Sequence, residues 1–250
     1  RNLAEVRAVT PVFGIMEQQS GANGWNTRME APSPRPGQMA LWTMQSVAHG
    51  ADYVSYFRWR TCTVGTEIYW HGILDYSGRD NRRIAEVGQI HEKLQSMKEL
   101  AGSIYEAQVG IVKDYDNIWD AQLDVWHERV DRASQPALFQ ALQLSHTPFD
   151  YVYLNDDTDV TEWKKYQVLF YPHATIMSKE REAVLRAYVE TGGTLVIGCR
   201  SGYKDMNGRC VMEKLPGLLA DLSGTDIPEY SFIAPDAGKV TIQWGDTELE

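Results

Sequence analysis

Short apolar runs alternate with helical patterns through the second half of this chain, and this alternation limits the possible folds more than any other feature. The runs are AQVGIV (107–112), FDYVYL (149–154), QVLFYP (167–172) and TLVIGC (194–199). Helical patterns stand between them, near 136–144 and at 179–190. Strands that are apolar along their whole length are buried on both faces, as in a parallel sheet covered by helices. We therefore expect a doubly wound α/β domain from about residue 106 to 225.

The first hundred residues follow a related order of strand, loop, helix, strand and loop. A strand at 9–16 leads into a Gly- and Pro-rich loop at 20–37, and a helical pattern at 38–49 ends at a glycine. A second strand at 52–59 (DYVSYFRW) again opens into a long loop. Residues 84–101 then carry an apolar stripe at spacings of three and four, which predicts a helix of about six turns. This order indicates βα units.

The charge balance excludes several classes of partner. The 250 residues include 24 Lys and Arg against 34 Asp and Glu, giving a net charge of -10. Phosphate binding needs clustered positive side chains, so we expect neither nucleic acid nor a membrane surface as a partner. Apolar runs fall well short of the roughly 20 residues that cross a bilayer as a helix. Three cysteines without regular spacing fit neither a disulfide framework nor a zinc site, which favours a cytoplasmic location.

Two carboxylates follow the predicted strands of the first region. Glu17 comes directly after the first strand and Glu67 lies in the loop after the second, so both project at the carboxyl ends of neighbouring parallel strands. The active sites of α/β barrels lie on that face. Aromatic and cationic side chains are concentrated around them, at Trp25, 56–60 and 69–71. Because aromatic rings pack on the apolar faces of sugars while carboxylates and arginines bind hydroxyls, this pattern favours a sugar site over solvated surface roles.

On spacing alone, Glu17 and Glu67 could form the pair of carboxyl groups that glycoside hydrolysis requires. Retaining enzymes hold a nucleophile and an acid/base about 5 to 5.5 Å apart. Arg58 or Arg60 could lower the pKa of the nucleophile, or could instead form a salt bridge that ties the second loop to the rim of the barrel.

Long and specific motifs cover roughly residues 11–80: ME-Q-Q…NGW, RPG, HGAD and YFRWR…E…H-G. Together they closely resemble the last two barrel strands of glycoside hydrolase family 42, the β-galactosidases. Ser20-Gly21 stands where that family usually has Pro-Gly, which leaves the geometry of this loop open.

The resemblance implies a role for each candidate site residue. In the family, the glutamate that ends the seventh barrel strand is the nucleophile, and this position falls on Glu17. The resemblance also implies that Trp25, Phe57, Glu67 and His71 contact the galactosyl ring. Glu67 is then a hydroxyl-binding carboxylate and not the acid/base. The family's acid/base is a glutamate after an asparagine at the end of the fourth strand, and we find no such strand in this segment.

The resemblance further implies a domain order. Chains of the family continue from the barrel into a flavodoxin-like trimerisation domain related to class I amidotransferases, and then into a small β domain. We therefore expect the end of the TIM barrel, with strands 7 and 8, at 1–104, the flavodoxin-like domain at 105–228 and the start of a β domain at 229–250.

A family 42 enzyme is expected to cleave terminal β-D-galactosides or galacto-oligosaccharides by double displacement, as a homotrimer and without a metal or other cofactor. The residues leave open whether galactosides or arabinopyranosides are preferred. This segment alone is expected to be inactive, because most of the barrel is missing from it.

The second domain suggests a rival hypothesis. Cys199 follows a parallel strand, as does the nucleophile of class I amidotransferases, and His127, His146 and His173 lie in the same domain. The G-x-C-x-G elbow is not met, so we expect Cys199 to pack as a small apolar residue.

The alternative to a hydrolase is therefore a non-catalytic oligomerisation or interaction module, with Trp119 and Trp126 at a subunit contact. The acidic groups around Asp114, Asp116 and 156–159 lack metal-site spacing, and we expect solvated loops there.

Overall fold

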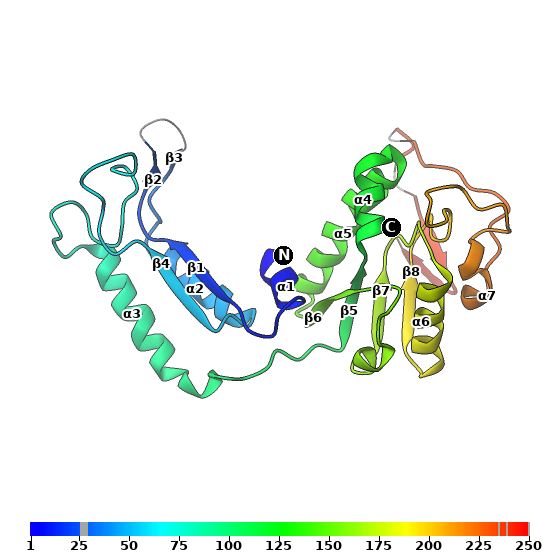
Figure 1. The fold of residues 1–250 in the computed structure, drawn as a ribbon, viewed down its shortest axis with the longest axis horizontal. Helices are drawn as coiled ribbons and strands as arrows, with labels where there is room; N and C mark the ends of the chain where they lie inside the picture. Colours follow the sequence, from blue (N-terminus) through cyan, green and yellow to red (C-terminus); the bar gives the residue numbers. More distant parts are fainter. Residues whose placement is uncertain (26–29, 235, 239, 250) are drawn as a thin grey trace.

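The computed structural model describes residues 1–25, 30–234, 236–238 and 240–249. They form two α/β parts, joined by the stretch between α3 (Arg82–Ser96) and β5 (Val109–Lys113), and Figure 1 shows these parts on either side of helix α1 (Asn2–Arg7). Within the described residues, none of the helices is both long and apolar enough to span a bilayer.

The first part is built on two parallel strands, β1 (Gly14–Gln19) and β4 (Tyr53–Phe57). Helix α2 (Gln38–Ala48) connects them, and α3 packs on α2. A two-residue antiparallel pair, β2 (Asn23–Gly24) and β3 (Glu30–Ala31), lies in the loop after β1. The strand begins at Gly14 and not at the predicted residue 9, since the Pro11 nitrogen has no hydrogen to donate to a ladder.

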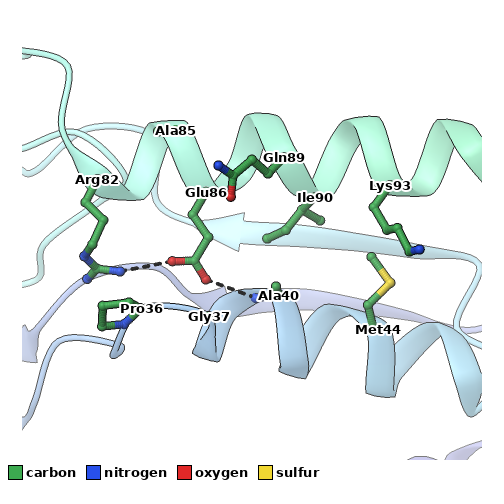
Figure 2. Close-up of a pocket in the computed structure, with 10 residues that line it drawn as sticks. All are labelled: Pro36, Gly37, Ala40, Met44, Arg82, Ala85, Glu86, Gln89, Ile90 and Lys93. Carbon is green, nitrogen blue, oxygen red and sulfur yellow. Dashed lines mark hydrogen bonds and ion pairs between the residues drawn. The ribbon is translucent and has the colours of Figure 1, made fainter.

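A carboxylate from α3 caps the N-terminus of α2 (Figure 2). Glu86 accepts a hydrogen bond of 3.2 Å from the Ala40 amide and a second, of 3.0 Å, from the Arg82 guanidinium. The residue before α2 is Gly37, which has no side chain to cap the helix. Glu86, only 7% exposed, therefore supplies the negative charge that the positive end of α2 favours. These residues border a cavity of about 320 Å³ between the two helices.

The second part contains a parallel sheet in the order β6-β5-β7-β8, which confirms the predicted parallel arrangement. Its remaining strands are β6 (Phe149–Tyr153), β7 (Val168–Tyr171) and β8 (Thr194–Ile197). Successive residues of β5 point to opposite faces: Ile111 belongs to one buried cluster and Val112 to the other. Helix α6 (Lys179–Glu190) covers one face, whereas α5 (Val125–Leu144) and α1 cover the other, so helices cover both faces of the sheet.

One sequence expectation for this part is confirmed only in part, and another is wrong. The helix predicted near residue 136 begins at Val125, after Asp124 caps it, and a further helix, α4 (Tyr115–Leu123), precedes it. The loop around Asp114 is not solvated either: Asp114 is 1% exposed and caps α4 through the Asn117 amide, 2.7 Å away. Capping and the ion pairs of Arg181 with Asp114 and Asp116 offset the cost of burying Asp114.

Arg7 connects the two parts. From the end of α1, Arg7 donates hydrogen bonds to the carbonyls of His49 (2.9 Å) and Phe149 (2.8 Å). It forms an ion pair of 3.1 Å with Asp150 and lies 3.6 Å from the centre of the Tyr105 ring. Both charged side chains are about nine-tenths buried, so Arg7 joins the end of α2 to β6 in a setting with little solvent screening.

The C-terminal residues continue through α7 (Ala220–Ser223) to an antiparallel pair, β9 (Ile242–Trp244) and β10 (Thr247–Leu249). The sequence run KVTIQW (239–244), with which we expect a β domain to open, ends in β9: its last three residues, Ile242–Trp244, are that strand, whereas residue 239 lies outside the described residues.

Candidate functional site

An irregularity in β1 places Glu17. Ile15 pairs with Val54 and Gln18 pairs with Tyr56, so two residues of β1, Met16 and Glu17, lie opposite one residue of β4. Such a bulge bends the strand and redirects its side chains, and bulges are common beside active sites. Glu17 therefore lies inside β1, two residues before its end, and not after the strand as expected; its side chain is exposed.

Three aromatic rings meet at the carboxyl ends of β1 and β4. The Trp70 ring lies 5.7 Å from the Trp25 ring, with an interplanar angle of 38°, and 5.8 Å from the Phe57 ring, which it meets at 88°. All three side chains are half-buried. The structure thus brings together Trp25 and Phe57, both predicted site residues, through the ring of Trp70. The sequence pattern included Trp70 in the aromatic cluster but predicted no role for it.

The loop after β4 folds back on its own start. Ile73 and Leu74 donate backbone hydrogen bonds of 2.7 and 2.8 Å to the carbonyls of Arg58 and Trp59. Thr61, 2% exposed, accepts from the Gly72 amide at 3.1 Å. A Cβ on Gly72 would lie 2.5 Å from the Arg58 carbonyl oxygen, so this close approach requires glycine.

The loop after β1 is fixed to the same place. The hydroxyl of buried Ser20 donates a hydrogen bond of 2.8 Å to the Phe57 carbonyl. The side-chain amide of Gln19 donates to the carbonyls of Gly21 and Pro32. The His71 amide in turn donates to the Ala22 carbonyl at 2.7 Å. Ser20 and Gln19 carry no sequence signal for this role, because their partners are backbone carbonyls.

Glu67 has a defined electrostatic partner. Its carboxylate lies 3.2 Å from the Arg58 guanidinium, with the two side chains 45% and 32% exposed. The structure therefore pairs Arg58 with Glu67, whereas the sequence suggested a partner for the nucleophile or a rim contact. At this exposure the pair adds about 0 to 1 kcal/mol to stability, so its main consequence is the orientation of Glu67.

The ring of His71 packs edge-on against Tyr76, 5.2 Å away, with its Nδ1 atom 3.5 Å from the Thr61 hydroxyl. The half-buried His71 thus lies in the same loop as Glu67, and its backbone contacts the loop that leads to Trp25. Trp25, Phe57, Glu67 and His71 are therefore brought together by the two loops that follow β1 and β4.

Cys199 does not pack as a small apolar residue, so that prediction is wrong. Cys199 is exposed. It lies in a tight turn: a Cβ on Gly198 would lie 1.8 Å from the Pro172 carbonyl oxygen, and Arg200 has a φ of 62°. The His173 Nδ1 atom lies 2.9 Å from the Cys199 carbonyl oxygen and 3.9 Å from its sulfur. A carbonyl only accepts, so Nδ1 carries a proton and cannot deprotonate the thiol. Burial also lowers the pKa of His173, which keeps it neutral.

The other two histidines of the rival hypothesis lie in different settings. His127 is buried and its Nδ1 atom lies 2.7 Å from the Asp120 carboxylate, whereas His146 has a φ of 54° just after α5. The amidotransferase constellation is therefore not assembled among these residues.

Charged side chains of the chain itself fill the crevice at the carboxyl ends of β5 and β7. Doubly wound sheets bind ligands in this position. Here Arg181, 5% exposed, pairs with Asp114, Asp116 and Asp156, and the Tyr171 hydroxyl donates to Asp114. Burial raises the pKa of Asp114, while hydrogen bonds from Asn117 lower it. The positive charge opposite these aspartates is therefore supplied by Arg181 of the same chain.

Comparison with known proteins agrees with this division of the chain. A β-galactosidase family model matches residues 3–97, and a model described as the β-galactosidase trimerisation domain matches residues 107–250. β-Galactosidase BgaA of Clostridium cellulovorans is 31% identical over 248 residues, which cover 94% of this chain and 36% of that protein. The chain thus spans about a third of the length of the curated relatives that it matches.

Solved structures show the same relationship. A β-galactosidase from the haloarchaeon Halorubrum lacusprofundi is 30% identical, with a TM-score of 0.69 over 86% of this chain and 31% of its own. The β-galactosidase from Bacillus circulans sp. alkalophilus, at 24% identity and a TM-score of 0.75 over 96% of this chain and 35% of its own, shares the fold. Since the trimerisation-domain model alone matches more than half of the residues, this chain belongs to glycoside hydrolase family 42, the β-galactosidases.

Proposed function

We propose that residues 1–104 are the end of a (β/α)8 barrel and carry the nucleophile and part of the sugar site of a retaining β-galactosidase. The parallel pair β1 and β4, with α2 and α3 beside it, has the order expected of strands 7 and 8. The observation that carries the proposal is the position of Glu17 at a bulge of β1, next to loops that gather three aromatic rings and a carboxylate.

In the proposed reaction, Glu17 attacks the anomeric carbon of a terminal β-D-galactoside. The glycosidic bond breaks, its oxygen takes a proton from an acid/base carboxyl outside residues 1–250, and a galactosyl ester of Glu17 forms. Water then attacks the anomeric carbon, gives its proton to the same acid/base group, and Glu17 leaves as a carboxylate. Galactose is released with its β configuration retained.

Four residues are proposed to hold the galactosyl ring. Trp25 and Phe57 offer flat apolar surface to the C–H face of the sugar. Glu67, oriented by Arg58, accepts hydrogen bonds from sugar hydroxyls, and His71 contacts the ring from the same loop.

We further propose that residues 105–228 assemble the protein into a homotrimer and that residues 229–250 begin a β domain. The half-exposed aromatic surface of Tyr115 and Trp119 supports such an assembly role, as does the exposed ring of Trp126, since aromatic side chains are enriched at interfaces. A Trp119→Asp variant of the complete protein should shift the sedimentation coefficient from trimer towards monomer. An unchanged trimer would assign the contact to another surface.

The catalytic proposal is tested by trapping. The complete protein is incubated with an activated 2-deoxy-2-fluoro-β-galactoside, which slows hydrolysis of the glycosyl-enzyme ester, and is then digested for peptide mass spectrometry. One fluorosugar on the Glu17 peptide is expected, and Glu17→Gln should lose both the adduct and turnover. The matched control is Glu30→Gln, an exposed carboxylate on β3, which should keep both. Turnover that survives Glu17→Gln would refute the assignment, and a protein that forms trimers without hydrolysing galactosides would favour the non-catalytic module.

A further inference from the structure

We infer that Trp70 is the positioning residue of the sugar site: it holds Trp25, Phe57 and Glu67 in the arrangement that receives the galactosyl ring. The inference rests on the proposed function, because it concerns the same site. The observations that carry it are contacts of one residue with several proposed binding residues, made by both its ring and its backbone.

The ring of Trp70 lies against the two aromatic surfaces that follow β1 and β4. It is tilted against Trp25 and stands edge-on to Phe57, with centre-to-centre distances of 5.7 and 5.8 Å. Both geometries are favoured by the charge distribution of aromatic rings. Because Trp25 lies in the loop after β1 and Phe57 is the last residue of β4, a shift of Trp70 changes their relative position even where the loop and the strand keep their own conformations.

The backbone of Trp70 fixes the carboxylate. Its amide donates a hydrogen bond of 2.9 Å to the Glu67 carbonyl, which closes the turn that carries Glu67. The Glu67 side chain is then held from the other side by Arg58, at 3.2 Å. The next residue, His71, donates its amide to Ala22, three residues before Trp25. Two contacts therefore join the turn that carries Glu67 to the loop that carries Trp25: the packing of the Trp70 ring on the Trp25 ring, and the hydrogen bond from the His71 amide to the Ala22 carbonyl.

A positioning role and a merely structural role predict different results. If Trp70 only contributed packing, truncating it would lower the melting temperature and leave the affinity of the folded enzyme for sugar unchanged. If Trp70 positions the site, affinity falls in the folded protein, and a smaller aromatic ring restores part of it. Trp70→Phe keeps a ring between Trp25 and Phe57, whereas Trp70→Ala removes it.

The experiment measures the dissociation constant of a galactose-configured iminosugar by titration calorimetry, together with kcat and KM for a nitrophenyl β-galactoside, on the complete protein. Trp70→Ala should weaken iminosugar binding about tenfold or more and raise KM, as expected for the loss of aromatic contacts, and Trp70→Phe should recover part of the loss. Tyr230→Ala, which removes an exposed ring from the C-terminal region, is the matched control and should bind as the unaltered protein does.

The outcomes separate the inference from the proposed function. If Trp70→Phe and Trp70→Ala both bind the iminosugar as tightly as the unaltered protein does, Trp70 does not position the site. The inference is then overturned, while the proposed function stands. If the unaltered protein neither binds the iminosugar nor hydrolyses the galactoside, the proposed function fails and the inference fails with it. Should Trp70→Ala not fold, Trp70→Phe decides: a melting temperature near that of the unaltered protein with several-fold weaker binding supports positioning, and unchanged binding refutes it.

Discussion

Gly21 is the position where one added methyl group should disturb the site most directly. A Cβ there would lie 2.5 Å from the His71 carbonyl oxygen and 2.8 Å from its carbonyl carbon. Ordinary contact begins at 3.4 Å, so the His71 backbone has to move by roughly 0.9 Å in Gly21→Ala. The His71 Cβ atom, 2.7 Å away, is the third close neighbour, and rotation about χ1 moves neither it nor the two backbone atoms, so no side-chain rotation relieves the clash.

The displacement reaches the proposed sugar site through one hydrogen bond. The His71 amide lies 2.7 Å from the Ala22 carbonyl, and this bond lengthens or breaks when the two loops separate. A misplacement of about 1 Å in an active site can lower the rate about 100-fold. We therefore expect Gly21→Ala to lower kcat/KM for a β-galactoside by about 10- to 100-fold and stability by about 1 to 3 kcal/mol, as for other overpacked sites.

The control is the same substitution in a helix. Gly88 lies in α3 with nothing within 4 Å of its Cβ position, so Gly88→Ala should stabilise the protein by roughly 0.5 to 1 kcal/mol and leave the kinetics unchanged. Initial rates and urea unfolding of the complete protein measure both effects. Wild-type kcat/KM and stability in Gly21→Ala would show that the two loops are not held at this distance, and the reasoning would fail.

Three further predictions concern the scaffold. Glu86→Ala should lower the free energy of unfolding by about 1 to 2 kcal/mol in urea titrations, because α2 loses its cap, and Glu86→Gln by less, because the amide oxygen still accepts. Lys204 lowers the pKa of Asp124 from 3.8 to about 2, so their pairing stabilises the protein above pH 3.8 and is lost as the pH falls towards 2. Asp124→Asn, which can still cap α5, should lower the free energy of unfolding by roughly 1 kcal/mol at pH 7 and reduce its loss between pH 3.8 and 2. If the free energy of unfolding of the variant falls with pH as steeply as that of the unaltered protein, the result contradicts the role of the pair. Arg7→Ala should destabilise by about 3 kcal/mol, since it leaves Asp150 buried with less charge compensation, and limited proteolysis should then cut the linker near residue 103 faster than in the unaltered protein.

The sheet of the second part could be predicted because its central strand β5 and its neighbour β6 are buried along almost their whole length. Burial favours continuous apolar runs, and the sequence has one at each of the four strands, for example VLFY at 168–171. The helix at 179–190 was equally readable, because Ser178 caps it and two glycines follow it.

The helices at the carboxyl edge of the sheet could not be predicted in the same way. Residues 115–135 have a weak apolar stripe, and their helical state depends on caps at Asp114 and Asp124. Asp114 looks like a solvated loop residue until the chain brings Arg181 to it from α6, 67 positions away in sequence. Local patterns carry no information about such a partner.

The site shows the same limit, with a consequence for how it works. Residue types pointed to Glu17 and Glu67 in an aromatic cluster, and the family resemblance added roles for Trp25, Phe57 and His71. The coupling between their loops is made by groups with no chemical signature: a buried serine hydroxyl, backbone amides and a glycine. Each of these links joins the loop after β1 to the end of β4 or to the loop after β4. A substitution that leaves every proposed sugar contact in place can therefore still disable the site by separating the two loops, and the five site residues should retain their function only where the links between these loops are also retained.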